Sequence, residues 1–183
     1  MVGQVLGDAE AIASYQAASS IPVALNFLPS ALITYIYPYF AYHKDDAAWL
    51  KRYYGRLMLV SACVFSLLSL FCCVFAEPII CLAYGEGYIS SVGAFRLLMM
   101  GFAISTPLRT ISGNLLATQR MLKTTLISNL MTVLTIYFGC VYLLPPFGIG
   151  GAAVAQVLGL IVAGAISTTA FVGRIIQLSK GRQ

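Results

Sequence analysis

Residues 124–173, "TTLISNLMTVLTIYFGCVYLLPPFGIGGAAVAQVLGLIVAGAISTTAFVG", run for 50 positions without a charged side chain. A straight α-helix of that length would measure about 75 Å, more than twice the ~30 Å hydrocarbon core of a bilayer. The stretch therefore has to enter a membrane and turn back. Pro145 and Pro146, followed by "GIGGAA", mark the turn and predict two helices, over about 124–144 and 149–173.

The rest of the chain has the same apolar character. It is 60% hydrophobic and 9% charged, with a mean hydropathy of +0.87, whereas a soluble domain carries about a quarter charged residues. Eleven bases and six acids cannot cover 183 residues with a water-soluble surface. Each membrane crossing has to satisfy its own backbone hydrogen bonds, so the crossings are helices. We therefore expect an all-α polytopic membrane protein with five transmembrane helices, the first three over about 12–41, 57–76 and 93–118.

The basic residues gather in the connections on one side of the predicted membrane. Nine of the eleven Lys and Arg lie in these connections, and the connections of the opposite side contain none. The positive-inside rule then predicts a cytoplasmic C-terminus and a periplasmic N-terminus. The N-terminus lacks a signal peptide, so an outside start with an odd number of spans predicts that helices precede this chain in a longer transporter. A complete five-span protein is the alternative. The basic connections are 43–56, 119–123 and 174–183, and the opposite ones are 1–10, 77–92 and 145–148.

Arg109 is the strongest functional signal, because it lies inside the third predicted span. A charge at a helix centre costs on the order of 3 kcal/mol on insertion scales, so it normally faces a cavity or a partner. Ser105 and Ser112, four residues before and three after, are predicted on the same helix face, and Asn114 extends the polar character. Pro107 removes a backbone hydrogen bond and predicts a kink. The pattern favours a wet cationic groove that attracts an anion. A structural arginine held by backbone carbonyls is the alternative.

Two further places in the predicted spans carry polar or helix-bending residues. Arg96 lies three residues into its span, where snorkelling to the outer interface accounts for it, and lining the same cavity is the alternative. Pro22 and Pro29 flank Asn26 in the first span and predict a bend, as in the broken helices of transporters, or are simply tolerated. Asn26 suits an interhelical hydrogen bond or, as the alternative, a ligand contact.

Other chemistry is not indicated by the sequence. The five cysteines lack the spacing of a metal site or a paired disulfide pattern and suit small apolar fillers. We expect no catalytic site, cofactor, metal or nucleic-acid partner, because no nucleophile–base pair or phosphate-binding loop is present. Small residues repeat every four positions in the last span and predict close approach of another helix. They are Gly151, Ala155, Gly159, Ala163 and Ser167.

Four stretches together resemble the C-terminal half of bacterial oligosaccharide flippases, within the multidrug/oligosaccharidyl-lipid/polysaccharide exporter superfamily. The resemblance implies a two-lobe transporter in the inner membrane, of which this chain is an incomplete six-helix lobe and the N-terminal lobe is a missing partner. It also implies that lipid-linked oligosaccharide is moved between leaflets by alternating access. The stretches are "ASYQAASSIPVALNFLPSALITYIYPYFA", "PIICLAYGEGYISSVGAFRLL", "GNLLATQRMLKTTLISNL" and "PPFGIGGAAVAQVLG".

The resemblance gives the polar residues a substrate. Arg109, with Arg96, Asn114 and Asn26 lining the cavity, would bind the diphosphate of an undecaprenyl-linked oligosaccharide. Pro22, Pro29 and Pro107 would act as hinges. Three alternatives remain: a lipid II flippase, an ion-coupled antiporter for organic cations, and a non-transporting membrane subunit that packs through its small residues. The antiporters of the superfamily use intramembrane carboxylates, and no acid lies at membrane depth in this chain.

Overall fold

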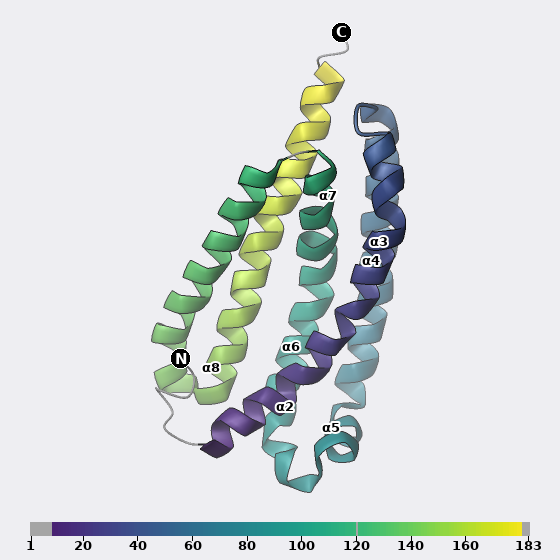
Figure 1. Ribbon diagram of the computed structural model, residues 1–183. Helices are drawn as coiled ribbons and strands as arrows, with labels where there is room; N and C mark the ends of the chain where they lie inside the picture. The colour runs from purple at the N-terminus through teal and green to yellow at the C-terminus, as the bar shows by residue number, and fades with distance from the viewer. Residues whose placement is uncertain (1–8, 120, 181–183) are drawn as a thin grey trace.

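The computed structural model describes residues 9–119 and 121–180, with the side chains of 9–11 and 149 left out (Figure 1). These residues form helices and short turns, without a strand among them. The prediction of an all-α multi-pass membrane protein with five crossings is confirmed. The five helices long and apolar enough to cross a membrane are Ile12–Tyr42, Ala47–Val74, Glu86–Thr118, Leu122–Gly148 and Gly150–Lys180.

The first two crossings differ from the predicted boundaries. The first consists of two helices, α2 (Ala9–Leu25) and α3 (Phe27–Tyr42), that are interrupted at Asn26. The second, α4 (Ala47–Val74), begins ten residues before the predicted span because Asp46 caps it: a carboxylate oxygen accepts the Trp49 N–H at 3.3 Å. The basic segment that we expected to be a connection is therefore largely the first turns of α4.

The chain reverses at two glycines with positive φ. α5 (Ala76–Tyr84) ends at Gly85, with φ 90°, and the 3₁₀ turn η1 (Glu86–Ser91) leads into α6 (Val92–Ser105). α6 continues through the π-helical turn η2 (Thr106–Ile111) into α7 (Ser112–Thr118). α8 (Leu122–Lys180) consists of two arms that meet at Gly148, with φ 53°, just after the two prolines that predicted this turn. Glycine adopts these angles at little cost.

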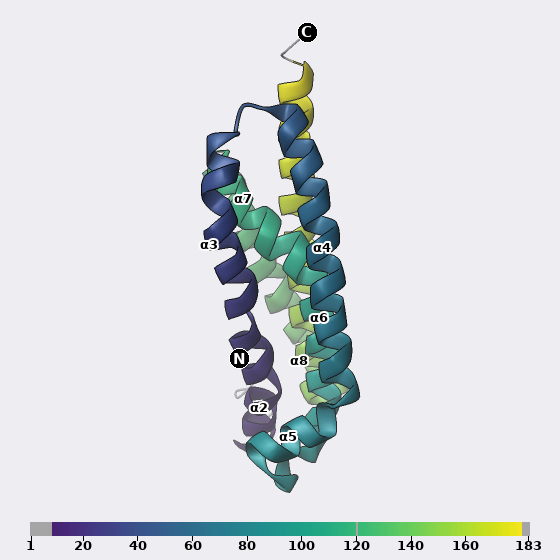
Figure 2. The same cartoon turned by 90° about the vertical axis from the view of Figure 1, so that its right-hand side faces the viewer.

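The continuous α6–η2–α7 rod is the centre of the bundle, with α8 on one side and α2, α3 and α4 on the other (Figures 1 and 2). In its most apolar stretch 56% of the residues are buried, against 17% to 33% in the other four crossings. The α3–α4 connection, the α7–α8 turn and the C-terminal end of α8 lie at one end, which we call the basic end. α5 and the turn of α8 lie at the opposite end (Figure 1). Arg120 and Arg182, two of the nine bases behind the predicted orientation, lie outside the described residues.

Two apolar clusters stabilise the bundle, one at each end. Phe95, Met99 and Phe102 of α6 pack against α4 and α5 in the first cluster. Leu115 and Phe171 belong to the second, which lies toward the basic end. Residues 103–110 of the central rod belong to neither cluster. A layer without an apolar core therefore separates the two ends.

The small residues of the last crossing pack as predicted, against the first arm of α8. Ser128 Oγ on that arm donates to the Ala163 carbonyl at 3.1 Å and lies 3.3 Å from Ser167 Oγ. A Cβ placed on Gly139 would lie 2.9 Å from the Cβ of Ala155, so the two arms are close at this point as well. Small side chains allow this approach.

Candidate functional site

Pro107 produces a π turn rather than a sharp kink. Thr106–Ile111 adopt the wider π-helical form. At the end of this segment the Ser112 N–H bonds the Arg109 carbonyl, three residues back, and not that of Leu108 as in a regular α-helix. Side chains take up the released carbonyls: Ser112 Oγ donates to Pro107 O at 3.3 Å, and Thr168 Oγ1 of α8 donates to Leu108 O at 3.0 Å. These hydroxyls satisfy carbonyls in the turn that begins at the proline, and the helix stays continuous. The N–H that Pro107 itself lacks would have served the Ala103 carbonyl.

Two neighbouring helices clamp this turn. The Tyr54 hydroxyl of α4 lies 2.7 Å from Ser112 Oγ, and Ser112 itself is completely buried. On α8, a Cβ at Gly164 would lie 2.7 Å from the Cβ of Leu108, so the helix backbone passes directly beside the turn. The position of Arg109 is thus fixed by contacts from outside its own helix.

Arg109 lies between two polar hollows and lines both. The first, of about 180 Å³, separates the central rod from the α2–α3 break and the second arm of α8. The second, of about 210 Å³, lies between the central rod and the two arms of α8. Polar residues of the first hollow are Ser19, Asn26, Ser105, Thr110 and Gln156, and those of the second are Thr110, Asn114, Thr125, Ser128, Asn129 and Ser167.

The Arg109 guanidinium is half-buried and keeps its donors free. Among the described residues it forms no ion pair and no hydrogen bond, in particular none to a carbonyl of a neighbouring helix. Its five N–H groups are therefore available to a ligand. An anion that entered either hollow would meet a positive charge flanked by hydroxyl and amide groups.

The hollows bring three of the predicted polar residues together with Arg109, namely Asn26, Ser105 and Asn114. The side chains of Asn26 and Asn114 also bond their own segments. Asn26 Nδ2 donates to Pro22 O at 3.0 Å, because the Asn26 backbone N–H bonds Val23 O instead. The Asn26 side chain thus replaces a backbone donor at the helix break and makes no interhelical bond to any residue that the structure describes. Asn114 Nδ2 donates to Thr110 O at 2.6 Å. Pro22 lines the first hollow, whereas Pro29 is buried in the first turn of α3 outside it.

The structure does not bring Ser112 or Arg96 to the hollows. The prediction that Ser112 shares the face of Arg109 is wrong, because the π turn has more residues per turn and directs Ser112 toward Tyr54. Arg96 lies nearer the other end of the bundle, where its Nε donates to Cys73 O at 3.2 Å. Its Nη2 pairs with a Glu77 carboxylate oxygen at 3.3 Å. These bonds tie α6 to α4 and α5.

Sequence reasoning overlooked Gln156 and Asn129. Gln156 accepts a hydrogen bond from the Tyr15 hydroxyl and lines the first hollow, and Asn129 lines the second. Each is a single amide in a long apolar run, and this isolation could have indicated a polar role for it. Such amides inside a membrane need a partner or a cavity.

Fold and site together define a multi-pass membrane protein with a cationic polar site inside its helix bundle. A family model described as "Polysaccharide biosynthesis protein" matches residues 1–93, half of the chain, and the chain belongs to this family. The matched part includes Pro22, Asn26 and Pro29 and ends before Arg96 and Arg109. No curated protein and no solved structure matches the chain.

Proposed function

We propose that this chain is part of a flippase that exports undecaprenyl-diphosphate-linked oligosaccharide across the bacterial inner membrane by alternating access. Its family is one of polysaccharide biosynthesis, and its five apolar helices suit a membrane transporter better than a soluble synthase. In this proposal the basic end faces the cytoplasm, where lipid-linked oligosaccharides are assembled. The protein would act as a transporter and not as an enzyme.

The observation that carries the proposal is the unpaired guanidinium of Arg109 between two polar hollows. A diphosphate offers several anionic oxygens, and the planar guanidinium binds such oxygens two at a time. The amides and hydroxyls of the second hollow, Asn114 and Asn129 among them, suit sugar hydroxyl groups. An apolar lipid tail would stay outside the hollows, in the bilayer.

The breaks in the helices suit the movement that alternating access requires. Pro22 and Asn26 line the first hollow at the point where α2 ends, and Arg109 lines it from the π turn. A tilt of α2 against α3 would therefore change the hollow without displacing the turn that holds Arg109. Discontinuous helices at a binding site are a recurrent feature of transporters.

Replacement of Arg109 by alanine in the chromosomal gene tests the proposal. We expect surface polysaccharide to be lost while the protein stays in the membrane at a normal level. Arg109→Lys keeps the charge without the planar fork and should restore only part of the export. Arg52→Ala is the matched control, since Arg52 is an exposed base of α4 outside the hollows. Normal polysaccharide in the Arg109→Ala strain would contradict the proposal.

The same strains separate the alternative substrates. Accumulation of peptidoglycan precursors in the Arg109→Ala strain would redirect the proposal to lipid II. Loss of resistance to organic cations would redirect it to an antiporter. The second outcome is disfavoured by the acids of the described chain, because Glu10, Asp45, Asp46, Glu77 and Glu86 all lie at helix ends or in connections.

A further inference from the structure

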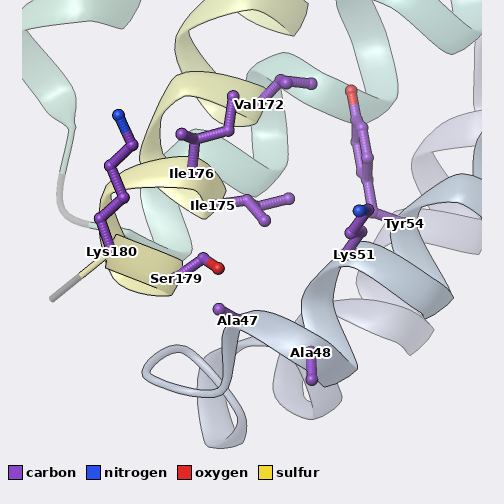
Figure 3. A pocket seen from close by; sticks show the side chains of 9 residues that line it. All are labelled: Ala47, Ala48, Lys51, Tyr54, Val172, Ile175, Ile176, Ser179 and Lys180. Atoms are coloured by element: carbon purple, nitrogen blue, oxygen red, sulfur yellow. The ribbon is translucent and has the colours of Figure 1, made fainter. Parts of the chain in front are cut away.

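A groove opens at the basic end of the bundle, and none of the residues that line it also lines the hollows around Arg109. It has a volume of about 620 Å³ and lies between the first turns of α4 and the last turns of α8 (Figure 3). Buried apolar or aromatic side chains form its floor, namely Ala47, Tyr54 and Ile175. Its volume falls within the range of about 300–1,000 Å³ that small-ligand sites occupy.

Lysines stand on both walls of this groove. Lys51 projects from α4 and Lys180 from α8 (Figure 3), and both side chains are exposed. Neither forms an ion pair within the described residues, and the residues that line the groove include no acid. The nearest acid in sequence, Asp46, caps α4 through the Trp49 N–H. The rim of the groove is therefore positively charged above an apolar floor.

The lengths of the two helices place this rim at the level of lipid headgroups. α4 has 28 residues and the second arm of α8 has 31, so they measure about 42 Å and about 46 Å against a hydrocarbon core of ~30 Å. Charged side chains are costly inside the core, so the surplus length falls at the end that carries Lys51, Arg52 and Lys180. Trp49 and Tyr53, next to Lys51 on α4, are the residue types enriched at that interface. Val172 lies about 12 Å deeper than Lys180 along the helix, which is acyl-chain depth.

We propose that this groove binds one anionic phospholipid. Its phosphate lies between Lys51 and Lys180, and one acyl chain follows Val172 and Ile176 toward the membrane centre. The apolar floor favours a hydrocarbon chain, and the two ammonium groups favour an anionic headgroup over a zwitterionic one. A protein segment in the same place would leave both lysines without a counter-charge unless it brought acids of its own. The inference does not depend on the proposed export function.

Quenching by brominated lipids tests this site directly. Trp49 is the only tryptophan of the chain, so Trp49→Phe removes the background and Ile176→Trp places a reporter in the groove. The protein is reconstituted in phosphatidylcholine vesicles that contain brominated phosphatidylglycerol or brominated phosphatidylcholine. We expect the phosphatidylglycerol to bind about 25-fold more tightly at this position, since each of the two lysines should contribute about 1 kcal/mol. In the same background Leu126→Trp, at an exposed position of the first arm, should show a ratio near one.

The lysines should account for this preference. Lys51→Gln and Lys180→Gln should each lower the ratio about fivefold, which corresponds to about 1 kcal/mol per basic residue near a lipid surface. Together they should bring it near one. Lys44→Gln with Lys123→Gln removes the same charge at the same end, outside the groove, and should leave the ratio unchanged. Helix content measured by circular dichroism checks that every variant is folded.

Three results would overturn the inference. The first is an equal ratio at the two tryptophan positions, which would indicate bulk lipid only. The second is a ratio that persists without both lysines. The third is the absence of quenching by either lipid in the Ile176→Trp protein, which would show that protein covers the groove.

Discussion

Proline interrupts the first crossing and the third in different ways. In the first, the helix ends at Leu25 and begins again at Phe27, and the exposed Asn26 satisfies the Pro22 carbonyl with its own side chain. In the third, the helix continues through a π turn, in which Thr168 of α8 and the buried Ser112 donate to the Leu108 and Pro107 carbonyls. The carbonyl beside the first break is thus satisfied from within its own segment, whereas those of the π turn are satisfied in part from another helix.

The two proline sites form opposite walls of the first hollow. Pro22 and Asn26 contribute one wall, and Ser105 and Arg109 contribute the other. Bonds within its own segment hold the α2–α3 wall, whereas contacts from α4 and α8 hold the wall of Arg109. We therefore expect the first crossing to move more readily than the turn that holds Arg109. Substitutions at the two sites should differ accordingly in their cost.

The largest effect is expected at Gly164, beside the π turn. Gly164→Ala would place a Cβ 2.7 Å from the Leu108 Cβ and 3.3 Å from its carbonyl carbon, so backbone has to move. We expect a loss of about 2 kcal/mol in the free energy of unfolding, the usual cost of overpacking. Gly173→Ala on the same arm is the matched control. No atom lies within 4 Å of its added Cβ, so it should be neutral or stabilising. Unfolding in mixed detergent micelles measures both, and equal costs would contradict the clamp.

An intermediate effect is expected at Thr168. Thr168→Val removes the hydroxyl that donates to Leu108 O and keeps the shape of the side chain. A hydrogen bond between membrane helices contributes about 0.6 to 1.7 kcal/mol, so a loss of about 1 kcal/mol should follow. Thr169→Val, one residue further on, removes an exposed hydroxyl that bonds only its own helix and should change little. If the two variants unfold alike, Thr168 does not support the turn.

The smallest effect is expected at Asn26. Asn26→Ala removes the bond to Pro22 O, which lies within one segment at an exposed position. This bond should contribute less than the ~0.6 kcal/mol of an average hydrogen bond between membrane helices. Alanine regains a similar amount through its higher helix propensity. The stability should therefore change by less than about 0.5 kcal/mol in the same unfolding assay. A cost greater than that of Thr168→Val would show that the α2–α3 break is held as firmly as the π turn.

The general architecture could be predicted because it depends on local composition. Long apolar runs, the Pro145–Pro146 turn and the repeated small residues each carry their meaning within a few turns of helix. The early start of α4 was missed because the basic residues of 51–56 suggested a connection, although Asp46 provides a standard cap. Charge marks the edge of the membrane but does not end a helix.

The site could be predicted only in part, for a reason that the π turn explains. Arg109, Asn26, Ser105 and Asn114 do line common hollows. Ser112 was placed on the wrong face because helical spacing assumes 3.6 residues per turn, and the π turn over Thr106–Ile111 departs from that spacing. Arg96 forms an ion pair with Glu77, 19 residues earlier in the sequence, because the fold of α5 brings the two side chains together. Partners of this kind are set by tertiary structure.

The two apolar clusters have no residue in common, and this separation affects how force passes from one end of the bundle to the other. Side chains inside each cluster interlock, so each end of the bundle behaves as a stiff block. The layer at residues 103–110 joins the blocks through hydroxyls and backbone carbonyls, with Tyr54, Ser112 and Thr168 as the connecting side chains. A few directed polar bonds therefore carry the mechanical link between the two ends, at the level of the only deeply placed cation within the described chain.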